Sequence, residues 1–183
     1  MLIFTPLKLQ LLKKWCGCLQ MSRIKCNTDG AALGTPGHAA CASVVRGHEA
    51  QYLGGFSVNL GFSFAFHAEL LGVMNAIEIA HEKGWWNLWL ETDSLMVTLA
   101  YKSSSMVPWM LRNRWNNCMV MLKDMNFILS HIYREGNALA DKLASLGFSY
   151  DGFKWFNVIP KEILQAYNHN RLGLLPLFRF SCP

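Results

Sequence analysis

The apolar pattern of this chain changes from a strand period to a helix period and back, and this order restricts the fold more than any single motif. Three strand-type segments come first, joined by short turns of Gly, Pro and charged residues, at 23–33, 39–45 and 52–60. Only antiparallel neighbours can be joined by turns this short. The first part of the chain is therefore predicted to be an antiparallel meander.

A helix period follows the third strand. Between 65 and 83, apolar residues recur at helical spacing and Gly84 provides a stop: Leu70, Val73, Met74, Ile77 and Ala80. The short apolar run at 87–92 that comes next has the length and composition of a buried strand. Because a helix between two strands of one sheet is typical of a βαβ crossover, this strand is predicted to run parallel to its neighbour.

The chain up to residue 150 adds one more strand and three more helices. The helices are expected at 94–102, 108–125 and 137–146, and the strand at 127–133. The order β-β-β-α-β-α-α-β-α predicts an α/β fold with a five-stranded mixed sheet and helices packed on both sides.

Charge and composition divide the chain into three parts. Residues 1–22 form a basic, apolar N-terminal arm, residues 23–150 the predicted domain, and residues 151–183 an aromatic tail. The pattern leaves open whether the tail folds back on the domain. The middle part holds most of the acids, whereas the formal net charge of the whole chain is +5. An acidic centre between basic arms suits a metal-dependent enzyme acting on phosphodiesters, and it equally suits an ordinary soluble protein.

Cysteine usage and hydropathy exclude several classes of protein. No spaced pair of CxxC motifs occurs, so a zinc site is not expected, and reduced thiols in a nuclear or cytoplasmic protein are the simpler interpretation. No run of 18 apolar residues exists, so no membrane partner is expected. Lysines interrupt the apolar N-terminus and no cleavage site follows it, which disfavours a signal peptide. We expect a monomer.

Four acids stand in contexts that suit metal binding, and each also has a simpler structural role. Asp29 precedes Gly30 within the first strand, where the pair indicates close approach of a ligand backbone or merely a turn. Glu69 lies early in the first helix, where the helix dipole also favours an acid. Asp93 follows the fourth strand and could cap a helix, whereas Asp141 could lie on a solvated helix face.

Cleavage of a phosphodiester requires an activated water and a stabilised leaving oxyanion. Two metal ions held about 3.5–4 Å apart by carboxylates can provide both. The first strand, the crossover helix and the end of the fourth strand are neighbours in a sheet of this order. The carboxyl ends of parallel strands are also where α/β sites form. The acids are therefore expected to converge.

Four ordered motifs resemble the ribonuclease H family, most closely its plant branch found in proteins derived from non-LTR retroelements. The resemblance covers residues 23–150 and extends weakly into the tail near Pro160, Tyr167 and 179–180. The motifs that carry it are Lys25–Ala31, Ala68–Leu70, Glu91–Ser94 and Arg134–Asp141.

The resemblance implies an Asp-Glu-Asp-Asp site binding Mg²⁺ or Mn²⁺ and cleavage of the RNA strand of RNA–DNA hybrids. The metal ligands would be Asp29, Glu69, Asp93 and Asp141. An alternative is a nucleic-acid-binding module that keeps the fold with little or no turnover. A third is a structural remnant that neither binds nor cuts.

Bacterial members of the family place a mobile His in a loop before the last acid, where it helps the product to leave. Here His131 precedes Asp141 by ten residues, but it falls inside the predicted strand 127–133. A histidine in a strand would be fixed, so its catalytic role stays open.

Many members of the family also carry a basic protrusion that grips the substrate between the middle helices. The corresponding stretch, 103–123, offers Arg112, Arg114 and Lys123 for phosphate contacts. It also contains Trp109 and Trp115, which could stack on bases or face the core.

Overall fold

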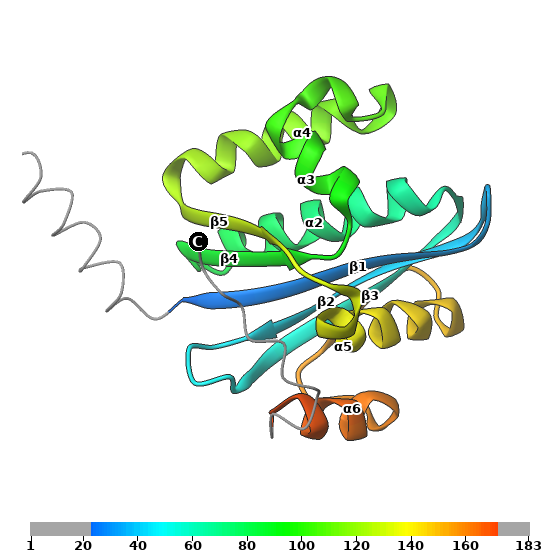
Figure 1. The fold of residues 1–183 in the computed structure, drawn as a ribbon, viewed down its shortest axis with the longest axis vertical. Helices are drawn as coiled ribbons and strands as arrows, with labels where there is room; N and C mark the ends of the chain where they lie inside the picture. Colours follow the sequence, from blue (N-terminus) through cyan, green and yellow to red (C-terminus); the bar gives the residue numbers. More distant parts are fainter. Residues whose placement is uncertain (1–22, 172–183) are drawn as a thin grey trace, which may run out of the picture.

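A six-stranded mixed sheet lies at the centre of the computed structural model, which describes residues 23–171 and the side chains of residues 23–168 (Figure 1). The strand order is β5-β4-β1-β2-β3-β6. β1 to β3 form the predicted meander, and β4 and β5 join it in parallel through β1. The strands are β1 (Ile24–Gly34), β2 (Gly37–Arg46), β3 (Tyr52–Ser63), β4 (Asn87–Thr92), β5 (Asn126–His131) and β6 (Phe153–Phe156).

Helices cover both faces of the sheet, as predicted (Figure 1). One face carries α2, α3 and α4, with α4 packed on α2, and the other carries α5 with α6 against it. The crossover from β3 to β4 runs through α2, which confirms the expected βαβ unit. The helices are α2 (Ala65–Glu82), α3 (Leu95–Lys102), α4 (Trp109–Met121), α5 (Arg134–Leu146) and α6 (Lys161–Arg171).

The sheet has one strand more than the sequence predicted. β6 lies within the aromatic tail and pairs antiparallel with β3, with Phe56 opposite Trp155. Four residues are too few to identify a strand from their pattern, and the open edge of β3 supplies the partner that makes this segment extended. The sheet is therefore six-stranded rather than five-stranded.

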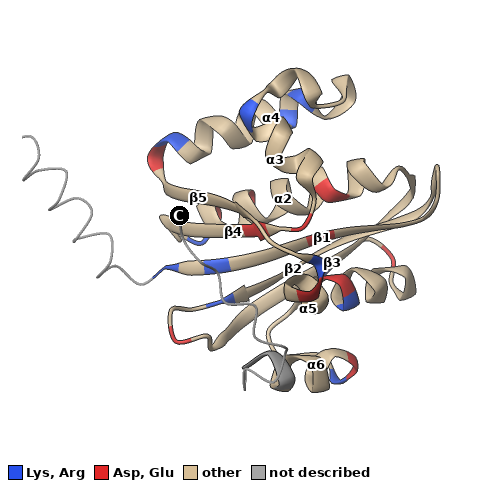
Figure 2. Ribbon diagram, viewed as in Figure 1, with Lys and Arg blue, Asp and Glu red and all other residues tan. Residues whose placement is uncertain are grey.

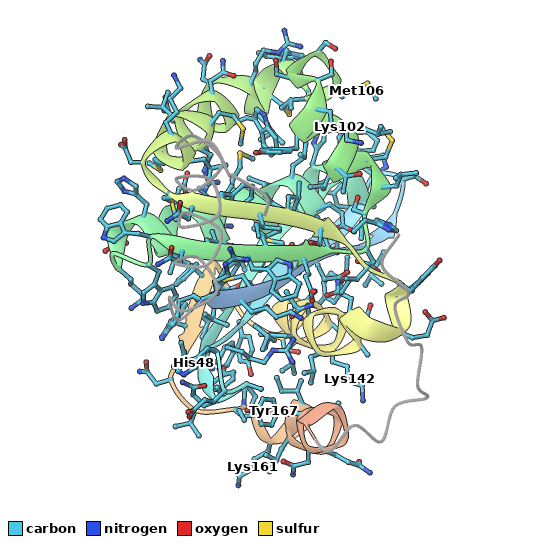
Figure 3. All side chains as sticks on the ribbon, turned by 60° about the vertical axis from the view of Figure 1, so that its left-hand side comes forward. His48, Lys102, Met106, Lys142, Lys161 and Tyr167 are labelled. Atoms are coloured by element: carbon cyan, nitrogen blue, oxygen red, sulfur yellow. The ribbon has the colours of Figure 1, made fainter. Side chains whose placement is uncertain are left out.

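The helix α6 of the tail also packs on the domain, so the described part of the tail folds back on it, a question that the sequence left open. Ile163 and Tyr167 of α6 are buried against α5, and the Tyr167 hydroxyl donates a hydrogen bond to the Ala50 carbonyl at 3.0 Å. Figure 3 shows Tyr167 pointing from α6 toward the domain, while Lys161 points away from it. Burying one such large side chain contributes about 1.5–3 kcal/mol.

The helix predicted at 137–146 begins earlier than expected. α5 starts at Arg134 rather than at 137, because Tyr133 is still extended and Glu135 stands in a first turn where an acid is favourable. Two residues separate His131, the end of β5, from this helix. The predicted helix 108–125 is shorter as well, since α4 ends at Met121 and a 3₁₀ turn follows.

Three cysteines lie among the described residues, and all three are buried free thiols: Cys26, Cys41 and Cys118. Burial raises the pKa of each to about 12, so they are unreactive near neutral pH. The arm 1–22 and residues 172–183, with the remaining cysteines and the 179–180 motif, lie outside the described residues. None of the described helices combines the length and apolar character needed to cross a membrane.

Candidate metal centre

The parallel register of β1 and β4 places two of the predicted acids side by side. Thr28 is paired with Thr92, so Asp29 and Asp93 come next on their strands at the same level of the sheet. Asp29 lies within β1, and Ser94 rather than Asp93 is the N-cap of α3. The simpler roles of turn and helix cap therefore do not apply to these two residues.

Gly30 brings the third acid to the same place. A Cβ atom at Gly30 would lie 2.2 Å from the backbone nitrogen of Glu69 and 2.4 Å from the carbonyl carbon of Ala68. The missing side chain thus lets α2 rest directly on β1, with Glu69 beside Asp29. The Asp-Gly pair was predicted to mark a ligand backbone, whereas the close approach is by the backbone of a helix.

Asp29, Glu69 and Asp93 form one carboxylate group, which we call the three-acid group. One oxygen from each residue can be chosen so that all lie within 4.8 Å of one another. Figure 2 shows acidic segments of β1, α2, α5 and the β4–α3 connection close together at the middle of the sheet. The Oε2 atom of Glu69 is buried and has no hydrogen-bond partner among the described residues. An orphaned carboxylate oxygen among oxygen donors fits a hard divalent cation such as Mg²⁺ or Mn²⁺.

Burial makes the charged forms of Glu69 and Asp29 unfavourable. Burial raises the pKa of Glu69 to about 9, and the charges of Asp29 and Asp93 add to the effect. The pKa of Asp29 rises to about 7, first through burial and then through Asp93 and Asp141. Arg134 acts in the opposite direction on both acids. A bound divalent cation would remove this penalty.

We therefore expect Glu69→Gln to stabilise the metal-free domain at alkaline pH. The pKa of the Glu69 carboxyl is about 9 in the folded domain, against an ordinary value of 4.5. The free energy of unfolding therefore falls as the pH rises between these two values, because the folded state resists losing this proton. At pH 8 in EDTA the variant should be more stable by about 1–2 kcal/mol in urea unfolding. The difference should vanish below about pH 4.5, where the wild-type carboxyl is protonated in both states.

The control for this experiment is Glu82→Gln, which changes an exposed acid at the end of the same helix. It should leave the pH dependence unaltered. Saturating Mn²⁺ should raise the stability of wild type and of this control, but not that of Glu69→Gln. If the Glu69→Gln domain were less stable than wild type at pH 8 in EDTA, a charged Glu69 would not destabilise the metal-free domain as expected.

The fourth predicted acid lies beside the three-acid group without belonging to it. Asp141 is on α5, and its carboxylate lies 3.6 Å from the guanidinium of Arg134. Its side chain is 39% exposed, and its charge is one cause of the raised pKa of Asp29. The structure thus brings three of the four predicted metal ligands together and holds the fourth nearby in an ion pair.

Asn137 is a residue of this site that the sequence argument missed. It is completely buried, and its Nδ2 lies 2.8 Å from Asp93 Oδ1, 2.9 Å from the Thr28 carbonyl and 3.4 Å from Asp29 Oδ1. Its spacing could have revealed it, because Asn137 stands four residues before Asp141 and therefore on the same face of the helix.

His131 is the last residue of β5 and lies near the three-acid group. Its side chain is exposed, and its Nε2 atom is 3.1 Å from the backbone carbonyl of Asp93. This hydrogen bond ties the ring to the β4–α3 connection. A fixed position is what its place in a strand predicted, and a role in product release stays a hypothesis.

The basic residues predicted to contact phosphate have different surroundings. The guanidinium of Arg114 forms an ion pair with Glu78 at 2.5 Å and donates a hydrogen bond to Asn75 at 2.7 Å, so it already has partners within the domain. Arg112 and Lys123 are exposed, and Arg112 donates a hydrogen bond to the Val107 carbonyl at 3.2 Å.

The two tryptophans of this stretch also differ. Trp115 is 1% exposed and belongs to the core, whereas Trp109 is 80% exposed at the start of α4. Only Trp109 is therefore free to stack on a ligand.

Sequence comparison identifies the relatives of this domain. The sequence model of a family described as reverse transcriptase-like matches residues 27–147. An Arabidopsis thaliana protein named as a candidate ribonuclease H protein is 36% identical over 152 residues, which is 82% of this chain. The match covers 24% of that protein, so the chain spans about a quarter of its length.

Solved structures show the same fold. Ribonuclease H1 of the archaeon Halobacterium salinarum has a TM-score of 0.63 at 24% identity, covering 69% of this chain and 98% of its own. LC11 ribonuclease H1, solved with an RNA/DNA hybrid, has a TM-score of 0.62 at 22% identity over 69% and 97% of the two chains. A foamy virus protease-reverse transcriptase is 27% identical with a TM-score of 0.55, and 69% of this chain matches 21% of it.

The meander, the crossover helix and the acids at the middle of the sheet define a ribonuclease H-like domain. With the family match over residues 27–147 and the plant relative, the chain belongs to the ribonuclease H-like family.

Proposed function

We propose that this domain is a metal-dependent endonuclease that hydrolyses the RNA strand of RNA–DNA hybrids. The three-acid group carries the proposal, because it combines oxygens within 4.8 Å of one another with a buried Glu69 oxygen that has no hydrogen-bond partner in the described part of the chain. Burying carboxylates this close together destabilises the fold when no cation is bound, whereas the same oxygens can serve as ligands of a divalent cation. The hybrid bound by LC11 ribonuclease H1 supports the choice of substrate.

Asp29, Glu69 and Asp93 would hold Mg²⁺ or Mn²⁺, and Asp141 would complete a second metal position. Bound cations supply Lewis acidity that activates water and stabilises the leaving oxyanion. Asp141 would have to exchange its contact with Arg134 for this role, and at 39% exposure its side chain has room to do so.

The residues of the chain itself would orient the reacting groups. Asn137 donates to Asp93 and keeps that carboxylate beside Asp29. The Oε2 atom of Glu69, which accepts no hydrogen bond from the residues that the structure describes, can orient a water for attack. His131, held against the Asp93 carbonyl, lies where it could transfer a proton to the product as it leaves.

The exposed groups on and after α4 supply a surface for the hybrid. Trp109 can stack on a base or sugar, and Arg112 and Lys123 can contact phosphates. Discrimination of the RNA strand would come from its 2′-hydroxyls and from the width of the hybrid groove. We leave Arg114 out of this surface because Glu78 already engages it.

The test is a titration of Mg²⁺ and of Mn²⁺ with the full chain and an end-labelled RNA–DNA hybrid. Cleavage should occur in the RNA strand alone, should rise with either metal and should stop with EDTA. RNA and DNA duplexes of the same sequence are the controls and should stay intact. A hybrid that is bound but remains whole at saturating metal would contradict the nuclease.

That outcome would favour a second function, a nucleic-acid-binding module with little or no turnover. Two observations favour this alternative. Asp141 is paired with Arg134, and two residues separate β5 from α5, so His131 has little freedom to move.

A further inference from the structure

Next to the three-acid group, a row of buried polar side chains lies on the face of the sheet to which Asp29 points. Asn27 and Glu91 are register partners on β1 and β4, two residues before Asp29 and Asp93 on the same strands. Asn27 is 2% exposed and Glu91 is 6% exposed. Buried polar groups in such a position must be satisfied by hydrogen bonds, and their partners determine how they are oriented.

The amide of Asn27 has one favourable orientation. Its Oδ1 accepts a hydrogen bond from the guanidinium of Arg46, while its Nδ2 donates to Glu91 Oε2 at 2.9 Å. Rotating this amide by half a turn would set N–H groups against a cation and a carbonyl against a carboxylate. The charges of Arg46 and Glu91 thus determine which end of Asn27 faces Asn137.

The orientation of the Asn27 amide determines the orientation of the Asn137 amide. The Nδ2 of Asn27 lies 3.4 Å from the Oδ1 of Asn137, so the oxygen of Asn137 faces a donor. Its own Nδ2 is then directed to Asp93, Asp29 and the Thr28 carbonyl. In the reverse orientation, the Asn137 oxygen would face acceptors alone. Asp29 and Asp93 repel each other, so they need this donor to stay together.

We propose that Glu91 is a positioning residue of the metal centre, acting through Asn27 on Asn137 to hold Asp29 and Asp93 in place for a cation. The inference rests on the proposed function to the extent that the three-acid group binds a metal. Glu91 also lies 2.9 Å from Lys25. That ion pair fixes the carboxylate of Glu91 and leaves its other oxygen for Asn27.

The test measures Mn²⁺ affinity by calorimetry in the full chain, without nucleic acid. Glu91→Gln keeps the size of the side chain but can present either an oxygen or an amide to Asn27. We expect it to weaken Mn²⁺ binding about tenfold, a typical effect of a residue that orients metal ligands. Asn137→Ala should weaken binding by at least as much. In the Asn137→Ala background, Glu91→Gln should cause no further loss, because Glu91 acts through Asn137.

Two further variants separate positioning from a purely structural role. Asn27→Asp retains the contact with Arg46 but places an oxygen opposite Glu91 and Asn137, so it should cause a similar loss of affinity. Glu78→Gln removes the acid of another partly buried ion pair, with Arg114, and should lower the melting temperature without changing the affinity. The ¹⁵N–¹H signals of the Asn137 side-chain amide should shift in Glu91→Gln and stay unchanged in Glu78→Gln.

The inference would be overturned if Glu91→Gln and Asn27→Asp both bound Mn²⁺ with wild-type affinity. It would also be overturned if Glu91→Gln reduced the Mn²⁺ affinity equally in the wild-type chain and in the Asn137→Ala background. If Glu91→Gln fails to fold, Asn27→Asp and its combination with Asn137→Ala decide the question. A wild-type chain that binds Mn²⁺ but leaves the hybrid intact would contradict the nuclease while supporting the inference through affinity alone. A wild-type chain that binds no Mn²⁺ would overturn both.

Discussion

Asp93→Asn is expected to reduce metal-dependent cleavage of the hybrid by at least about 10³-fold, which corresponds to about 4 kcal/mol of transition-state stabilisation. The substitution removes one charge from the three-acid group and keeps nearly the same shape. The remaining Oδ1 can still accept the hydrogen bond from Asn137, so the fold should persist. Initial rates at saturating Mg²⁺, together with a melting curve for each protein, measure both effects.

The matched control is Asp124→Asn. Asp124 is exposed and precedes β5, at the end of the parallel strands opposite His131. The Asp124→Asn variant should cut the hybrid at the wild-type rate. Asp93→Asn should also lower the pKa of Asp29, because the charge of Asp93 is one cause of its rise. A folded Asp93→Asn domain with more than a tenth of the wild-type rate would show that the reaction does not use this carboxylate.

Gly30→Val is expected to destabilise the domain by about 3 kcal/mol or more and to separate Glu69 from Asp29. The first added atom would already lie 2.2 Å from a backbone nitrogen of α2, and backbone atoms there move only if the helix lifts from β1. Urea unfolding measures the loss of stability. Mn²⁺ calorimetry below the unfolding transition should show weak or no binding, since Glu69 moves with α2.

Gly136→Ala provides the comparison for this variant. Gly136 lies in the first turn of α5, and its nearest neighbour to a new Cβ would be the Ile132 Cδ1 atom at 3.8 Å, an ordinary contact. Because alanine is favoured over glycine in a helix, this change should be neutral or stabilise by up to about 1 kcal/mol. A Gly30→Val domain as stable as Gly136→Ala would contradict the direct packing of α2 on β1.

Local patterns were sufficient for most of the elements. The strand-type composition and short turns of β1 to β3 and the helical spacing of α2 are properties of neighbouring residues, so they can be recognised without the tertiary structure. β6 differed because its four residues become a strand only by pairing with β3. The start of α5 differed by three residues, since a helix end depends on a few weak interactions.

The site could be predicted in outline for a similar reason. Asp29 lies within the first strand and Asp93 directly follows the fourth, and these two strands were predicted to be neighbours. Glu69 belongs to the crossover helix that leads from the third strand to the fourth. Gly30 signalled a close approach, but the amino-acid type does not say which group approaches. Asn137 looked like an ordinary polar helix residue, and its burial depends on where α5 crosses β1.

The sequence alone determined the order of the elements and the presence of acids within β1, early in α2 and after β4, because short-range periodicity and composition carry that information. The tertiary structure decided which acids share a cation-sized space, which one pairs with Arg134 instead, and how Glu91 reaches Asn137. Most of these features depend on contacts between different elements, and the hydrogen bonds that link Asn27 to Glu91 and to Asn137 join residues 64 and 110 positions apart, which no local pattern encodes.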